Sequence, residues 1–201
     1  MDIRVDLLTA PAPGGGERAD AARNRAKILA AAAELFTNRD PRAVTMDDIA
    51  KAAGVGRGTL YRRYPDIGAI ATALLDDHER KLQEQLLGGT PPLGPGAPPA
   101  ERLAAFYAAM VELLDAHGDL VLGAERGEAR FATGAYGFWA AHVRALLVAA
   151  GVARPDPLVD VLLAPVAVEV YRHQRERGID SGQITAALAD LAHAVIASAT
   201  S

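Results

Sequence analysis

The chain has 201 residues, half of them hydrophobic, so it is long enough to bury a core and lacks the composition of a disordered polypeptide. It has no cysteine, which excludes disulfides, thiolate metal ligands and cysteine nucleophiles. The formal net charge is −4, yet residues 23–63 hold nine basic and four acidic side chains, a local charge of +5 that leaves −9 for the rest. A basic segment on an acidic body favours a polyanionic partner.

Neither a membrane span nor an export signal is predicted. The longest apolar stretch without a charged side chain, residues 131–143, has 13 residues, whereas a membrane-crossing helix needs about 20. The first residues include acids and lack the apolar block of a signal peptide. We therefore expect a cytoplasmic protein that does not contact membranes.

The N-terminal region begins with a tail and continues as a helix. Residues 1–17 are rich in proline and glycine and are expected to form a flexible tail. Apolar residues then recur at helical spacing, at Ile28, Ala32 and Leu35, and predict a helix over 19–38. The segment 38–41, which contains a proline, is expected to end it.

Residues 45–64 read TMDDIAKAAGVGRGTLYRRY and predict two short helices with a tight turn between them. Thr45 is a suitable N-cap for a helix that ends at Ala53. Gly54 follows where the turn requires a positive φ, and a second helix reaches Tyr64. This is the pattern of a helix-turn-helix, whose second helix enters the major groove of DNA.

The second of these helices carries the side chains suited to DNA. If Leu60 faces the core, a step of about 100° per residue places Gly58 and Arg62 on the far side. Arg57 can reach a guanine edge from the first turn, and Gly58 would let the backbone approach DNA closely. The alternative, a solvated basic helix in an ordinary bundle, does not require a glycine, small residues and apolar residues in this register.

The remaining elements are also expected to be helices, so the fold class is all-α. Asp66 can cap a long helix that reaches residue 87, and a glycine- and proline-rich linker occupies 88–99. Pro165 should kink or interrupt its helix. The later helices are expected at 100–117, 126–150, 155–178 and 181–198.

Residues 24–75 resemble the N-terminal domain of TetR-family transcriptional regulators. The resemblance rests on Thr45, Ile49-Ala50, Ala53-Gly54-Val55, Gly58-Thr59-Leu60-Tyr61, Tyr64-Pro65 and the preceding Ala33-Glu34-Leu35-Phe36. It implies an N-terminal three-helix helix-turn-helix domain joined through a long fourth helix to a C-terminal helical bundle. The expected organisation is a tail over 1–17, a DNA-binding domain over 18–65, and a regulatory domain for ligand binding and dimerisation over 66–201.

The resemblance further implies a repressor that binds palindromic double-stranded operator DNA as a homodimer and is released by a small-molecule effector. By the same resemblance, the DNA contacts carry over to Thr45, Arg57, Gly58, Thr59, Tyr61, Arg62 and Arg63. Two positions depart from the family pattern. Gly56 stands where members often have a serine cap, and Ile67 stands where a phosphate-binding lysine is common.

Two further sets of residues are expected in the C-terminal region, and for any single one of them plain core packing is the alternative explanation. Residues that could line an effector pocket are Phe106, Met110, Trp139, His142 and Leu162. Residues that could form the dimer interface are Leu158, Leu162, Pro165, Ile184, Leu188, Leu191 and Val195.

No catalytic, metal or cofactor site is predicted. The sequence has no GxxxxGK phosphate loop, no HExxH motif and no two histidines four residues apart. The alternative to a regulator is an architectural DNA-binding protein. Such a protein would bind mixed-sequence DNA nearly as well as any operator, mainly through phosphate contacts.

Overall fold

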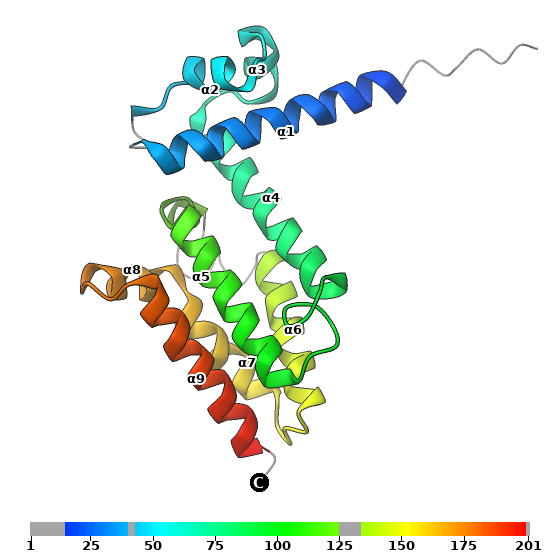
Figure 1. Ribbon diagram of the computed structural model, residues 1–201, viewed down its shortest axis with the longest axis vertical. Helices are drawn as coiled ribbons and strands as arrows, with labels where there is room; N and C mark the ends of the chain where they lie inside the picture. Colours follow the sequence, from blue (N-terminus) through cyan, green and yellow to red (C-terminus); the bar gives the residue numbers. More distant parts are fainter. Residues whose placement is uncertain (1–14, 40–42, 125–133, 200–201) are drawn as a thin grey trace, which may run out of the picture. The chain divides into compact units, whose positions relative to one another are not determined.

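The computed structural model describes residues 15–39, 43–124 and 134–199, and every regular element within these ranges is a helix (Figure 1). The predicted all-α fold class is confirmed. The elements are α1 (Gly15–Asn38), α2 (Met46–Ala53), α3 (Arg57–Arg63), α4 (Ile67–Gly88), α5 (Pro99–Ala124), α6 (Gly134–Ala149), α7 (Asp156–Leu163), the 3-10 helix η3 (Ala164–Val166), α8 (Val168–Glu176) and α9 (Ser181–Ala199).

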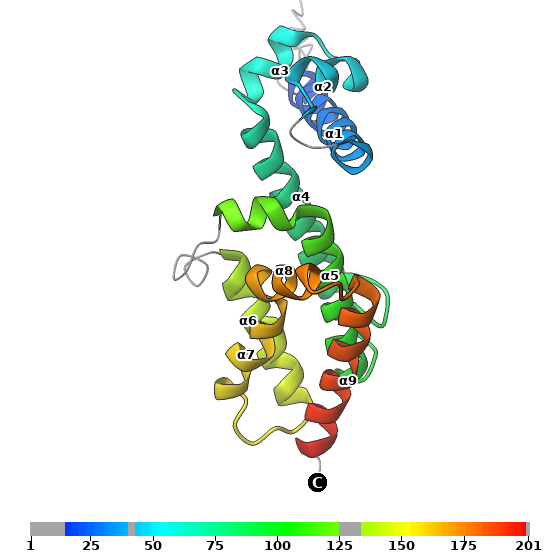
Figure 2. The same cartoon turned by 90° about the vertical axis from the view of Figure 1, so that its left-hand side faces the viewer.

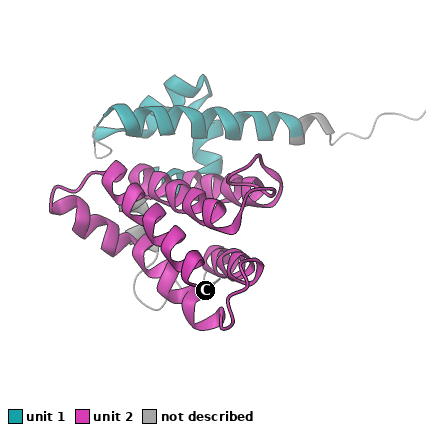
Figure 3. Ribbon diagram, turned by 60° about the horizontal axis from the view of Figure 1, so that its bottom comes forward, with its two compact units in different colours: residues 1–71 teal, residues 72–201 magenta. Residues whose placement is uncertain are grey.

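The chain divides into two compact units, Met1–Ala71 and Thr72–Ser201, so the division falls within α4 (Figure 3). In the first unit, α1 packs against α2 and α2 against α3 (Figure 2). The apolar residues that predicted these helices form its core, and Ile28, Ile49 and Leu60 are each 0% exposed. The amphipathic pattern of the sequence therefore accounts for the packing of this unit.

The second unit is built around α5, against which α6, α8, α9 and η3 pack. Figures 1 and 2 show α5 and α9 side by side. Phe106 and Tyr107 of α5 are fully buried, and the Tyr107 hydroxyl donates a hydrogen bond of 2.9 Å to the backbone carbonyl of Leu162. Burial raises the pKa of Tyr107. The hydroxyl therefore stays protonated and ties α5 to α7.

Pro165 interrupts its helix, as the sequence predicted. The expected helix over 155–178 consists of α7, η3 and α8, with Pro165 within η3. Ala167 is extended, with φ −68° and ψ 138°, and is the N-cap residue that precedes α8. A proline cannot donate the backbone hydrogen bond that a continuous helix needs, so the chain changes direction here.

Two predicted helix boundaries were wrong. The first helix begins at Gly15, inside the expected tail, whose residues 1–14 lie outside the described ranges. Helix α5 continues through Gly118 to Ala124 instead of ending at 117. A helical glycine costs only about 1 kcal/mol relative to alanine, too little to end a 26-residue helix that packs against several others. Of the helix expected over 126–150, the part before Gly134 lies outside the described ranges.

The start of α4 agrees with the sequence prediction. The Asp66 carboxylate accepts a hydrogen bond of 2.8 Å from the backbone N–H of Ala69, which satisfies one of the free donors at the helix start. Residues 89–98 contain no helix, in agreement with the expected linker. Within the described ranges, no helix combines the length and apolar character needed to cross a bilayer.

Candidate nucleic-acid interface

A capping box fixes the start of α2. The Thr45 hydroxyl accepts a hydrogen bond of 3.2 Å from the backbone N–H of Asp48, and the Asp48 carboxylate accepts one of 3.0 Å from the backbone N–H of Thr45. The same hydroxyl donates to the Asp48 carboxylate at 2.6 Å. These hydrogen bonds to Thr45 hold the pKa of Asp48 below its usual value. The expected contact of Thr45 with a phosphate stays a prediction, and here its proton is already donated to Asp48.

The turn between α2 and α3 has the geometry that the sequence indicated. Gly54 is left-handed, with φ 64° and ψ 33°. Its backbone N–H donates to the carbonyl of Lys51 at 3.3 Å, and the N–H of Val55 donates to that of Ala50 at 3.1 Å. This pair of hydrogen bonds is a Schellman motif, which closes the end of α2 and sets the direction of α3.

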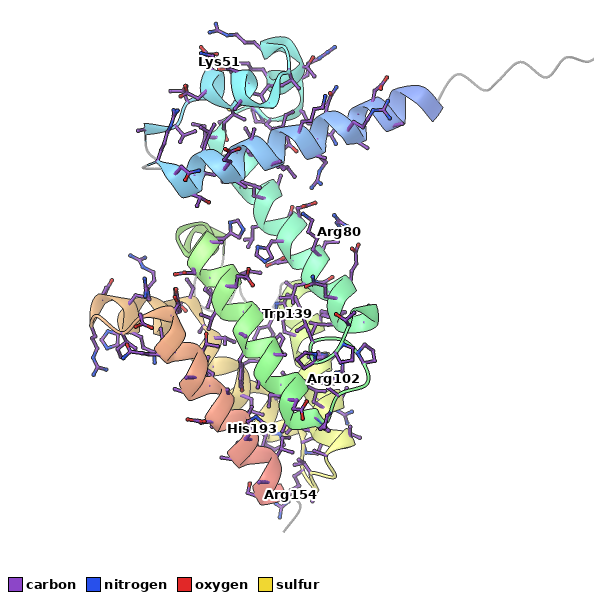
Figure 4. The ribbon with its side chains drawn as sticks, in the orientation of Figure 1. Lys51, Arg80, Arg102, Trp139, Arg154 and His193 are labelled. Carbon is purple, nitrogen blue, oxygen red and sulfur yellow. The ribbon has the colours of Figure 1, made fainter. Side chains whose placement is uncertain are left out.

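Helix α3 separates one buried side chain from a polar surface. Leu60 is fully buried, Tyr61 is 50% exposed, and Thr59 is half-buried. The other predicted contact residues on this helix are exposed: Arg57, Gly58, Arg62 and Arg63. At this end of the unit, Lys51 projects from α2 (Figure 4). The structure thus presents most of the predicted contact residues on one short helix.

Two of the arginines have intramolecular partners. Arg57 forms an ion pair with Asp47 in the first turn of α2. The Arg63 guanidinium donates a hydrogen bond of 3.5 Å to the backbone carbonyl of Ala21 in α1. Sequence reasoning missed both contacts because they depend on the angle between helices. The only signal in the sequence was the acidic residue Asp47 in the first turn of α2.

Both positions that depart from the family pattern are visible in the structure. Gly56 precedes α3 and provides no side-chain cap, and the N–H groups of Thr59 and Leu60 donate to its backbone carbonyl. Ile67 is half-buried at the start of α4. Its side chain is uncharged and cannot replace the lysine as a phosphate contact.

Replacing Gly58 with alanine should raise the unfolding free energy by about 0.5–1 kcal/mol while lowering affinity for DNA about tenfold. A Cβ at this position would meet no protein atom within 4 Å. Alanine reduces the backbone freedom of the unfolded chain, which stabilises the helix relative to it. The added methyl group, however, lies on the surface that is expected to approach DNA. Urea unfolding and fluorescence anisotropy measure the two effects. Gly137→Ala in α6, also free of neighbours within 4 Å, should stabilise the protein without changing DNA affinity. Equal DNA affinities for the two variants would contradict a close approach at Gly58.

Comparisons with known proteins identify the family. A family model described as bacterial regulatory proteins of the tetR family matches residues 28–74. An uncharacterized HTH-type transcriptional regulator of Mycobacterium tuberculosis is 44% identical over 61 residues, which is 30% of either chain. The match therefore spans less than a third of the length of this relative. The crystal structure of a TetR transcription regulatory protein from Mycobacterium vanbaalenii is 32% identical, has a TM-score of 0.53, and is aligned over 80% of this chain and 97% of that one.

The chain belongs to the TetR family. A transcriptional regulator from Rhodococcus sp. Rha1 shares the fold, with a TM-score of 0.61 at 16% identity over 90% of this chain and 98% of that one. The family model covers the helix-turn-helix, where capping and turn geometry restrict the residues. The C-terminal helices match as a fold.

The second unit of this TetR-family chain contains a small apolar cavity of about 50 Å³. Of the five predicted pocket residues, Met110 and Trp139 line it, together with Tyr136 and the carboxylate-bearing Glu79. The other three are not part of its lining: Phe106, His142 and Leu162. Phe106 and Leu162 are buried in the core of the unit.

His142 packs against Phe106, with the ring centroids 5.4 Å apart. Its Nε2 atom is buried and has no hydrogen-bond partner. Burial, and secondarily the charge of Arg102, lowers the pKa of His142 to about 4. The imidazole is therefore neutral at physiological pH, and the side chain lies half-buried against Phe106.

The predicted dimer residues fall into two groups. Three are buried within the chain: Leu162, Ile184 and Leu188. The others retain partial exposure: Leu158, Pro165, Leu191 and Val195. Only the second group has surface available to a partner.

Proposed function

We propose that this chain is a transcriptional repressor that binds palindromic operator DNA as a homodimer and is released by a small-molecule effector. The observation that carries the proposal is the polar face of α3, where Arg57, Tyr61 and Arg62 are exposed while Leu60 anchors the helix in the core. The second helix of a helix-turn-helix, when its buried face is fixed in the core, can enter the major groove and read base edges. A repressor of chromosomal DNA acts in the cytoplasm, which is the location we propose.

The expected contacts follow from the chemistry of each side chain. Arg57 suits the O6 and N7 atoms of a guanine, and Gly58 lets the backbone approach the bases. Hydroxyl groups and the remaining arginines suit phosphate oxygens. The residues proposed for these phosphate contacts are Thr45, Thr59, Tyr61, Arg62 and Arg63. We assign DNA binding to residues 18–65 and ligand binding and dimerisation to residues 66–201.

The proposed effector site lies in the second unit, near Met110 and Trp139. Apolar and aromatic walls with a few polar groups are typical of small-molecule sites. The cavity of about 50 Å³ is much smaller than the roughly 300–1,000 Å³ of such sites. Effector binding therefore requires the cavity to expand. Phe106, which packs against the lining residue Trp139, would move together with His142 and Leu162. A ligand that favours the expanded state shifts the population of the protein towards it.

The proposed dimer uses the exposed face of the C-terminal helices. Leu191 and Val195 lie four residues apart on α9, and both retain partial exposure. Leu158 and Pro165, which precede α8, are also partly exposed. Because Ile184 and Leu188 are buried in the same chain, they support α9 from behind. A symmetric pair of such faces would present two reading helices to a palindromic site.

The first experiment is fluorescence anisotropy with wild-type protein and an Arg57→Ala, Tyr61→Ala double variant. The DNA is the operator selected by the wild type from genomic fragments, compared with scrambled DNA at two salt concentrations. The wild type should favour the operator about a thousandfold. The double variant should lose about 100-fold or more in operator affinity. A bidentate guanine contact contributes about 1–3 kcal/mol, and a hydrogen bond to a charged phosphate about 1.5–3 kcal/mol.

The opposite result would favour the architectural alternative. Equal binding of both DNAs, with a steep salt dependence and no effect of the double variant, would mean that α3 does not read sequence. Hydrogen exchange in α2 and α3 provides a check that the first unit of each protein is folded, because Trp139, the sole tryptophan of the chain, lies in the second unit. The operator complex can then be used to screen for compounds that release the DNA.

A further inference from the structure

Asp47 and Arg57 are joined across the helix-turn-helix. Asp47 lies in the first turn of α2, Arg57 lies in the first turn of α3, and their side chains form an ion pair. Both side chains are on the surface, 49% and 71% exposed respectively. The pair therefore lies at the face where α3 is proposed to meet DNA.

The neighbouring acid, Asp48, does not pair with Arg57. Its carboxylate accepts from the backbone N–H and the hydroxyl of Thr45 and lies 4.0 Å from the Arg39 guanidinium. Asp48 is thus the residue that caps α2, and Asp47 takes no part in the capping box. The Asp47 carboxylate is therefore available to Arg57, and its replacement leaves the cap intact.

An arginine can bind a carboxylate and a guanine at the same time. The guanidinium has five N–H donors in a plane, and a bidentate contact with guanine uses two of them. In this structure, Asp47 accepts from Nη2 of Arg57. The second hydrogen of this nitrogen and the remaining nitrogens can face a base edge while the carboxylate restricts the rotamers of the long side chain.

We propose that Asp47 is a positioning residue that orients the Arg57 guanidinium for a guanine and thereby raises the sequence selectivity of the protein. The proposal rests on the DNA-reading function assigned to α3. A held guanidinium loses less rotamer freedom when it binds guanine, so affinity for the operator rises. The same carboxylate is repelled by the phosphates of any DNA, so its charge lowers affinity for the operator and for mixed-sequence DNA alike. Positioning by Asp47 thus raises affinity for the operator alone, whereas its charge lowers affinity for both kinds of DNA.

The test is Asp47→Asn, measured by anisotropy on the selected operator and on mixed-sequence DNA. Loss of positioning should weaken operator binding about threefold, in line with the strength of exposed ion pairs. Loss of the negative charge should strengthen binding to both DNAs about two- to threefold, so that affinity for mixed-sequence DNA rises while affinity for the operator changes little. The ratio of the two affinities should therefore fall about threefold, by the loss of positioning alone. Guanine should also become more replaceable at the position that Arg57 reads.

The matched control is Asp20→Asn in α1, which removes the same charge from another exposed ion pair of the first unit, the one with Arg23. Its affinity ratio should equal that of the wild type. In an Arg57→Ala background, Asp47→Asn should shift affinity for both DNAs in the same direction and leave the ratio unchanged.

Two outcomes would overturn the proposal, and they are distinguishable. If the wild type selects an operator and Asp47→Asn leaves the affinity ratio unchanged, Asp47 contributes only its charge, and the proposed function stands. If the wild type itself binds all DNA equally, the DNA-reading function fails together with the role of Asp47.

Discussion

Replacing Leu60 with alanine is expected to destabilise the first unit by about 2–5 kcal/mol and to abolish DNA binding. The Leu60 side chain is 0% exposed and provides the only buried residue of α3. Small units have little stability in reserve, so a loss of this size leaves much of the unit unfolded at equilibrium. A reading helix without its anchor cannot hold Arg57 and Tyr61 in place.

Hydrogen exchange of the full-length protein, followed by mass spectrometry, localises this effect. Peptides from α2 and α3 should lose protection in Leu60→Ala, while peptides from α5 and α9 keep theirs. The emission of Trp139, buried in the second unit, should not change. Tyr61→Ala is the control, because Tyr61 is the next residue and 50% exposed. It should weaken DNA binding and leave protection unaltered. Wild-type protection in Leu60→Ala would show that α3 is held by other contacts.

The helix-turn-helix was predictable because short-range interactions determine it. Thr45 and Asp48 cap α2 within one turn, and Gly54 provides the left-handed residue required by the Schellman motif. These interactions join residues at most five positions apart in the sequence, so they leave a recognisable pattern. The break at Pro165 and the cap at Asp66 were predictable for the same reason.

The features that sequence reasoning missed depend on distant parts of the chain. Asp47 and Arg57 meet because the loop between α2 and α3 brings the first turns of the two helices together. No periodicity in the sequence predicts the distance between these two side chains. Helix α5 passes Gly118 because its packing against several helices outweighs the local cost of one glycine. An apolar stripe also does not reveal what covers it. Ile184 and Leu188, expected at a dimer interface, are covered by their own chain.

His78 and His117 show the same limit and lead to a prediction about pH. They are 39 residues apart in sequence, and Nε2 of His117 shares a hydrogen bond of 3.1 Å with Nδ1 of His78. Burial, and secondarily the neighbouring His78, lowers the pKa of His117 to about 4. The pKa of His78 is also lowered, mainly by burial, although the nearby Glu112 opposes this shift. Protonation of both rings would leave donors facing each other in this contact.

Lowering the pH from 7 to 5 is therefore expected to cost the second unit about 2–3 kcal/mol of unfolding free energy. The unfolded chain takes up protons on histidine near its usual pKa of about 6.5. The folded chain takes them up on His117 and His142 only near pH 4. Between these values, acid favours the unfolded state, so stability is fully present above about pH 6.5 and is lost progressively towards pH 4.

Urea unfolding at pH 7 and pH 5, followed through Trp139 emission, measures this loss. A His117→Gln, His142→Leu variant should lose much less stability between the two pH values. Glutamine and leucine do not titrate, so unfolding no longer adds protons at these two positions. Glutamine at 117 retains a side-chain donor for His78, and leucine at 142 removes a buried nitrogen that lacks a partner. The control replaces two exposed histidines, His173 in α8 and His193 in α9 (Figure 4), with glutamine. It should retain the pH dependence of the wild type, and an equal flattening in both variants would mean that burial of His117 and His142 is not its cause.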